Sequence, residues 1–184
     1  RLSPHNYLQA SYICKNAYNF FPPATIHIII INFFEKIPTH VLMAQINNQF
    51  IICPDNGILT MIAGGKPNTV AAIPMQASKN TTLLECFSFI AAAAKRIIAG
   101  ENLFTANAAI ADFEEKYAMR SASGNNWIET QIIYIDHFEN VVLNLTRDEF
   151  EELRQKRKFK IVLMRNSEFI ENISTCYADV QPGE

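Results

Sequence analysis

The sequence predicts an α/β protein, with a layered N-terminal α/β domain followed by a small β-rich, barrel-like C-terminal domain. Helical apolar spacing alternates with buried strand patterns in the N-terminal part, whereas short strand patterns dominate after a small and polar segment at residues 118–126. The composition, 49% apolar and 18% charged residues, suits a packed core rather than disorder. Because 184 residues suffice for one large or two small domains, we place the domains at 1–118 and 127–184.

The N-terminal part opens with a predicted helix and a buried strand. The dipeptide Ser3–Pro4 is typical of a helix start, and apolar residues then recur at helical spacing over residues 3–20. Pro22 and Pro23 end this helix because neither nitrogen can donate a hydrogen bond. Residues 25–32 are apolar on both faces, which favours a strand inside a parallel or mixed sheet covered by helices.

A hairpin and a longer helix follow. Residues 41–46 and 50–53 are two predicted strands joined by Asn47 and Asn48, a turn composition that tolerates positive φ. After an apolar segment at 58–62 and a short strand at 70–73, Thr82 and Glu85 have capping-box spacing. The apolar stripe behind them predicts a helix that ends at Gly100.

The C-terminal part is predicted to be mostly strands. Thr146 and Glu149 form a second capping-box pair, which opens a short charged helix to about Arg157. The strand candidates are residues 128–135, 141–145, 159–164 and 173–177.

Charge and hydropathy exclude several classes of function. A formal net charge of −2 gives no field that attracts nucleic acid or an anionic membrane, and no apolar run approaches the roughly 20 residues of a membrane span. No secretory leader precedes Arg1, although a residue other than Met at this position leaves earlier processing open. Four widely separated cysteines favour free thiols and a cytoplasmic location over disulfides.

Common catalytic signatures are absent from the sequence. It contains no GxSxG, Walker, Rossmann or HExxH pattern, and no metal site is predicted. His27 lies in an apolar strand, where a hydrogen-bonded core imidazole is the simpler interpretation. The other histidines, His5, His40 and His137, carry no spacing that chemistry requires.

Two polar clusters are candidate ligand sites. Residues 54–57 (Pro-Asp-Asn-Gly) end a predicted strand, where α/β sheets bind ligands, but this composition is also ordinary turn chemistry, and the spacing leaves both interpretations open. Residues 135–140 lie between two predicted strands and contain a carboxylate, an aromatic ring and an amide. By itself this second spacing favours a hairpin turn.

Several segments, in order, resemble the S-adenosylmethionine hydroxide adenosyltransferase family, whose relatives include the fluorinase and chlorinase enzymes. Four segments are each similar to a family motif: the Tyr-Asn-Phe-Phe-Pro turn leading into Thr-Ile-His-Ile, the Pro-Asp-Asn-Gly segment, the alanine-rich helix ending in glycine, and the Tyr-Ile-Asp-His-Phe-Glu-Asn segment. These segments are residues 18–22 with 25–30, 50–60, 90–100 and 133–144.

The resemblance implies a function. Family members attack the 5′ carbon of S-adenosylmethionine with activated water, which yields adenosine and methionine. The motif match assigns Asp136, Phe138 and Asn140 to substrate binding: the carboxylate to the methionine ammonium, the ring to adenine and the amide to its edge. S-adenosylmethionine is then the substrate, no cofactor is implied, and each pocket is expected between subunits of a homo-oligomer, a trimer in the family.

The departures from the family leave the catalytic residues unassigned. Asn32 replaces the aspartate expected to polarise water, and the family's His-Gly-Arg-Asp stretch falls on Glu85 to Ser88. Glu139 replaces a glycine. Glu85 is a possible base, but its capping-box role is the simpler explanation, and Glu35 is a further candidate. The alternative is a non-catalytic homologue that binds S-adenosylmethionine or a nucleoside, or is purely structural.

The resemblance is also incomplete at the ends. It begins after the family's opening strand-helix-strand region and stops at Glu184, before the family's final strands. We therefore expect the chain to be a fragment, because a sheet that lacks strands exposes unpaired backbone groups.

Overall fold

The fold is given by a computed structural model that describes residues 5–78, 80–105, 108–163, 169–176 and 179. Packing divides the chain into two units. The first is Arg1–Met119 with Ile132–Val142, and the second is Arg120–Gln131 with Leu143–Glu184. The predicted domain limits, 1–118 and 127–184, stay a prediction, because packing within one chain does not establish independent folding.

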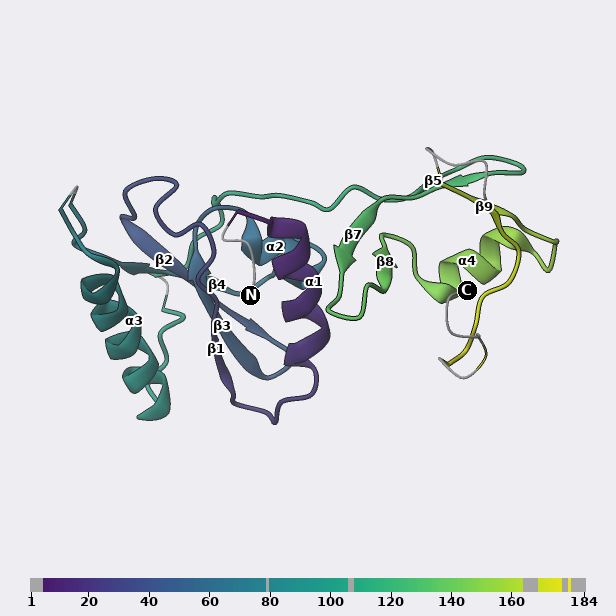
Figure 1. The fold of residues 1–184 in the computed structure, drawn as a ribbon. Helices are drawn as coiled ribbons and strands as arrows, with labels where there is room; N and C mark the ends of the chain where they lie inside the picture. The colour runs from purple at the N-terminus through teal and green to yellow at the C-terminus, as the bar shows by residue number, and fades with distance from the viewer. Residues whose placement is uncertain (1–4, 79, 106–107, 164–168, 177–178, 180–184) are drawn as a thin grey trace. The chain divides into compact units, whose positions relative to one another are not determined.

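A four-stranded mixed sheet forms the centre of the first unit, in the order β1-β3-β2-β4 (Figure 1). Strand β1 (Ile26–Ile28) runs parallel to β3 (Gln49–Pro54). Strand β2 (His40–Ile46) is antiparallel to both β3 and β4 (Val70–Pro74). The carboxyl ends of β1 and β3 therefore lie at the same edge of the sheet as the start of β2.

Helices cover both faces of this sheet (Figure 1). Leu42 and Ala44 of β2 belong to the core under α1 (Tyr7–Tyr18) and α2 (Ile58–Ala63), whereas Val41 and Met43 belong to the core under α3 (Leu83–Ile98). This alternation follows from the two-residue period of a strand. The layered α/β fold predicted from the sequence is confirmed.

The hairpin and α3 form as predicted. Asn47 and Asn48 adopt φ values of 49° and 59° between β2 and β3, as a two-residue turn with positive φ requires. Helix α3 begins with a reciprocal capping box between Thr82 and Glu85, and the backbone reaches a φ of 81° at Gly100.

The first helix and the first strand differ from their predicted limits. Helix α1 begins at Tyr7, because Asn6 is the N-cap and its side chain accepts a hydrogen bond from the Gln9 amide. The expected start, Ser3–Pro4, lies outside the described residues. Strand β1 is shorter than the predicted 25–32, because the chain leaves the sheet and turns at Asn32, where φ is 45°.

In the second half of the chain, the described residues form two-stranded pairs and one short helix. Strand β5 (Ala122–Ser123) pairs with β6 (Ile128–Glu129), so residues 118–126 are not simply a linker. Strand β7 (Ile132–Ile135), which pairs with β8 (Val141–Leu143), packs on α1 within the first unit, with the rings of Tyr12 and Tyr134 5.7 Å apart. Among the described residues the sheets of this half are two-stranded, and the expected barrel is not closed.

Three further predictions for this half need correction. The predicted strand 128–135 is divided into β6 and β7. Helix α4 (Arg147–Arg154) has the predicted capping box but ends before Arg157, because Gln155 and Lys156 adopt positive φ. The predicted strand 159–164 is shorter, because in its described part only β9 (Ile161–Val162) is a strand, which pairs with β10 (Phe169–Ile170).

The described part of the predicted strand 173–177 is instead a turn held by a carboxylate. Asp179 accepts hydrogen bonds from the amides of Thr175 and Cys176, and hydrogen bonds from Thr175 are the main reason why the pKa of this carboxyl is lowered. Residue 177 lies outside the described part of the chain.

Candidate functional site

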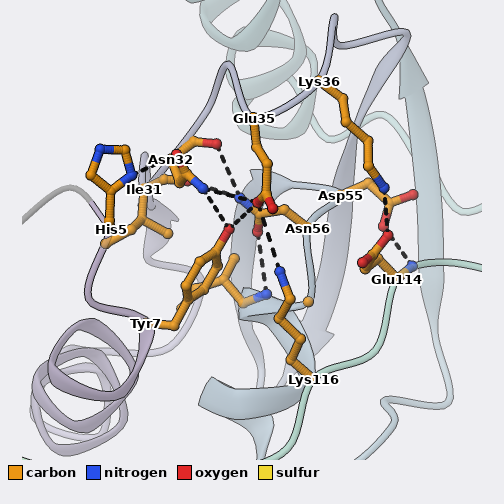
Figure 2. A network of polar contacts seen from close by, with 12 residues as sticks. His5, Tyr7, Ile31, Asn32, Glu35, Lys36, Asp55, Asn56, Glu114 and Lys116 are labelled. Carbon is orange, nitrogen blue, oxygen red and sulfur yellow. Dashed lines mark hydrogen bonds and ion pairs between the residues drawn. The ribbon is translucent and has the colours of Figure 1, made fainter.

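Polar side chains gather at the edge of the sheet where β1 and β3 end (Figure 2). Asn32 follows β1, and the Asp55–Gly57 turn follows β3. Helix α1 contributes Tyr7 to the same cluster, and the segment before β2 contributes Glu35. This edge is where open α/β sheets commonly bind ligands.

A carboxylate in this cluster is fixed by three neighbours. The Tyr7 hydroxyl donates to Glu35 Oε2 at 2.5 Å, Asn32 Nδ2 donates to the same oxygen at 2.9 Å, and Lys116 Nζ lies 3.7 Å from it. The Tyr7 hydrogen bond is the main reason why the pKa of Glu35 is lowered. Burial and Glu35 raise the pKa of Tyr7 to about 12, so Tyr7 remains a neutral donor.

Asn56 joins the two chain segments of the site. It is 7% exposed, and its Nδ2 donates to the Ile31 carbonyl at 2.9 Å while its Oδ1 accepts from the Ile58 amide at 3.3 Å. The loop after β1 is thereby fixed to the turn after β3. Gly57 adopts a φ of 88°, and a Cβ there would lie 2.4 Å from Lys116 Cγ. Asn56 and Gly57 are thus structural residues of the turn.

Asp55 has a different role, because it contacts a histidine. Its Oδ2 lies 2.9 Å from His40 Nε2, and its Oδ1 accepts from the Glu114 amide at 2.7 Å. The other ring nitrogen of His40, Nδ1, lies 3.0 Å from Thr39 Oγ1. The side chains of His40 and Asp55 are 25% and 19% exposed, so both are largely desolvated.

The histidine is a site residue that sequence reasoning missed, since His40 was judged by its spacing in the sequence alone. The signal lay in the predicted hairpin. A two-residue turn at Asn47–Asn48 pairs Val41 with Pro54, as observed, and the next residues on the two strands are His40 and Asp55. The register of this hairpin therefore places His40 beside Asp55.

A pocket of about 160 Å³ lies among these groups. Its walls are residues 32–33 and 35–40, the turn 54–56, and Glu114. A second hollow of about 300 Å³ shares Lys36, Ile37 and Pro38 with it. The wall of the first pocket contains three carboxylates against one lysine, and Lys36 pairs with Glu114 at 2.9 Å. This charge balance favours a cationic ligand.

The three predicted substrate-binding residues lie together in the turn between β7 and β8. Asp136 accepts hydrogen bonds from the amides of Phe138 and Asn140 at 2.8 Å each and from Asn140 Nδ2 at 2.7 Å. The Asn140 side chain is the main cause of the lowered pKa of Asp136. Phe138 is 76% exposed and contacts the His137 ring edge-on. Their ligand-binding role stays a prediction.

The other sequence candidates have structural partners. Glu85 accepts from the Thr82 amide at 2.7 Å, and these capping bonds lower its pKa, which makes it a weaker base. His27 Nε2 lies 2.5 Å from Gln49 Oε1, in agreement with a hydrogen-bonded core imidazole.

The four cysteines were expected to be isolated buried thiols. All four are free, and Cys53 and Cys86 are buried, but Cys14 is only partly buried and Cys176 is exposed. Over the described part of the chain, no group of three or more His, Cys, Asp or Glu is arranged to hold a metal ion. No helix in the same residues has the length and apolar character needed to cross a membrane.

Comparison with known proteins relates the whole chain to one fold. A crystal structure of an uncharacterized conserved protein from Thermotoga maritima matches 100% of this chain and 72% of its own, with a TM-score of 0.77 and 21% identity. A conserved hypothetical protein from Thermus thermophilus matches 78% of this chain and 57% of its own, with a TM-score of 0.56 and 15% identity. No curated protein matches the chain.

Family models give the more specific result. The N-terminal domain of the SAM hydroxide adenosyltransferases matches residues 1–110, and their C-terminal domain matches residues 130–184. These domains support an activity related to S-adenosylmethionine in general. The chain therefore belongs to the SAM hydroxide adenosyltransferase family.

Proposed function

We propose that the protein binds S-adenosylmethionine and hydrolyses it to adenosine and methionine, by attack of water on the 5′ carbon. The observation that carries this proposal is the charge of the pocket at the ends of β1 and β3. Glu35, Asp55 and Glu114 line it, and these three carboxylates face two lysines, Lys36 in the wall and Lys116, which pairs with Glu35. The remaining negative charge suits the sulfonium of the substrate, which is a cation. The family domains supply the substrate class.

The geometry suits a reaction that needs little covalent machinery. A sulfonium is already a good leaving group, so most of the acceleration comes from holding water, carbon and sulfur in line and accepting the proton of the water. The Asn32 amide nitrogen donates to Tyr7 and Glu35, and its oxygen lies 3.0 Å from His5 Nδ1. One lone pair of this fixed oxygen is left to accept from a bound water or ribose hydroxyl.

The pocket is too small for the whole substrate. Its volume of about 160 Å³ lies below the roughly 300–1,000 Å³ of sites for ligands of this size. We propose that it holds the reacting end, and that a second copy of the chain, in a homotrimer, supplies the surface for adenine and the amino acid end. Phe138 is the proposed adenine contact, because an exposed aromatic ring is available for stacking.

The same turn offers a polar contact for the amino acid end. Asp136 uses its carboxylate to hold the turn, but a carboxylate has about four acceptor positions and can also accept from the methionine ammonium. Asn140 is the proposed contact to the adenine edge. We further propose a cytoplasmic location, since four free thiols suit a reduced compartment.

A second candidate function is binding without turnover. It is favoured by Asn32, because an amide at this position cannot take a proton from water in the way the family's carboxylate does. The protein would then be a non-catalytic homologue that binds S-adenosylmethionine or a nucleoside.

Two measurements separate these functions. Incubation with S-adenosylmethionine, followed by chromatography, should give adenosine and methionine in equal amounts. Calorimetry should show weaker binding of both S-adenosylmethionine and adenosine to Phe138→Ala than to the wild type. Binding without turnover would favour the non-catalytic homologue, and equal affinities for wild type and Phe138→Ala would refute the adenine contact.

A further inference from the structure

Asn32, Glu35 and Asp55 line the pocket, but none of them is suited to accept the proton of the attacking water. Asn32 is an amide, which is not a base at neutral pH. Glu35 is held ionised by hydrogen bonds from Tyr7 and Asn32 to one oxygen, which makes it a weak base. Both oxygens of Asp55 already have partners.

We propose that Thr39, His40 and Asp55 form a proton relay that takes the proton from the attacking water. This inference rests on the hydrolysis proposed above. All three residues line the pocket that also contains Asn32. Thr39 Oγ1 lies 3.0 Å from His40 Nδ1, and His40 Nε2 lies 2.9 Å from Asp55 Oδ2. The carboxylate, the imidazole and the hydroxyl thus form a continuous chain that ends at the pocket.

The hydrogen bonds fix the direction of the relay. An ionised carboxylate only accepts, so Asp55 requires the hydrogen of a neutral His40 to be on Nε2. Nδ1 is then the acceptor and takes its hydrogen bond from the Thr39 hydroxyl. The lone pairs of Thr39 Oγ1 remain to accept from a water in the pocket, because Thr39 lines the pocket and is exposed.

The proposed step balances in atoms and charge. The water oxygen forms a bond to the 5′ carbon, the carbon–sulfur bond breaks, and its electron pair stays on sulfur as a neutral thioether. The water proton passes to Thr39 Oγ1 while the hydroxyl proton of Thr39 passes to His40 Nδ1. Asp55 stabilises the imidazolium, which then releases the proton to solvent.

The position of Asp55 makes a sharp test possible. Its Oδ1 accepts from the Glu114 amide at 2.7 Å. In Asp55→Asn the single side-chain oxygen must stay on that donor, so the NH₂ group faces His40 and forces its hydrogen onto Nδ1. His40 can then no longer accept from Thr39, which is the wrong-tautomer effect known from serine protease triads.

Nitrogen NMR of the His40 ring in the protein without substrate tests this geometry directly. In the wild type, the neutral ring should carry its hydrogen on Nε2, and in Asp55→Asn it should carry it on Nδ1. A wild-type ring with its hydrogen on Nδ1 would overturn the relay, whatever the activity of the protein.

Turnover of S-adenosylmethionine tests the role in catalysis. Thr39→Val and His40→Gln should lower kcat by about 10²-fold or more, the usual contribution of a positioned acid or base. Thr39→Ser is the matched control, since it keeps the hydroxyl and should keep turnover within a few fold. Calorimetry with S-adenosylmethionine should give the same Kd for all of these variants.

The outcomes distinguish the two proposals. A wild-type protein that releases no adenosine would overturn the hydrolysis and the relay together. If the wild type hydrolyses S-adenosylmethionine and Thr39→Val or His40→Gln has the same kcat, the relay alone is overturned. Recovery of turnover by added imidazole in His40→Gly would support the relay, because a merely structural histidine is not replaced in this way.

Discussion

The buried amide of Asn56 should stabilise the fold and the site together, and Asn56→Ala tests this. The substitution removes the hydrogen bonds to the Ile31 carbonyl and from the Ile58 amide. A buried polar group left without a partner costs about 1–3 kcal/mol, so two such groups should lower the free energy of unfolding by about 2–6 kcal/mol. For a chain of this size, in which 1 kcal/mol shifts Tm by about 2–4 °C, this corresponds to a Tm lower by roughly 4–24 °C.

Urea unfolding followed by circular dichroism measures this loss. Asn102→Ala is the matched control, because the Asn102 side chain accepts from the Phe104 amide at an exposed position. The control should change stability by no more than about 1 kcal/mol. If Asn56→Ala loses no more than Asn102→Ala, at an unchanged m-value, the proposed link between the β1 loop and the β3 turn is refuted.

Three further predictions concern the Glu35 carboxylate, the turn at Gly57 and the cap of α3. Tyr7→Phe should raise the pKa of Glu35 in an NMR titration, because it removes the main hydrogen bond that lowers it. An unchanged pKa of Glu35 in Tyr7→Phe would contradict this prediction. Because the folded-state pKa of Glu35 lies below its unfolded value, the ionised carboxylate stabilises the fold above the unfolded pKa, and this stabilisation is lost as the pH falls through the folded pKa. Gly57→Ala should cost about 1–2 kcal/mol in urea unfolding because of its φ of 88°, whereas Gly65→Ala, with no atom within 4 Å of the new Cβ, should change little; equal effects would argue against strain at residue 57. Thr82→Ala should cost about 1 kcal/mol through loss of the α3 cap while leaving S-adenosylmethionine turnover unchanged, and a large loss of turnover would mean that Glu85 or its neighbours take part in the chemistry.

Local signals in the sequence predicted much of the fold. The β2–β3 hairpin follows from Asn47 and Asn48, because few other residues tolerate positive φ at two consecutive positions. The starts of α3 and α4 follow from capping boxes, in which Thr and Glu satisfy backbone donors three residues apart. Each of these signals lies within a few residues of its effect.

Tertiary contacts decided the rest. The apolar run 25–32 predicted a long strand, but the chain turns at Asn32, whose side chain bonds to Tyr7 in a distant helix and to Glu35 three residues further on. Nothing in the sequence indicated that the Glu35 carboxylate would contact Tyr7 and Asn32. The pairing of His40 with Asp55 needed the strand register, which spacing along the chain does not reveal by itself.

The central claim is that the cluster at the ends of β1 and β3 binds the reacting end of S-adenosylmethionine. Titration of isotope-labelled protein with S-adenosylmethionine, followed through backbone amide shifts, tests it most directly. The account predicts saturable shifts at Asn32, Thr39, His40 and Asp55, with no comparable shifts in α4. Binding that leaves these amides unmoved, or that shifts only residues remote from them, would contradict it.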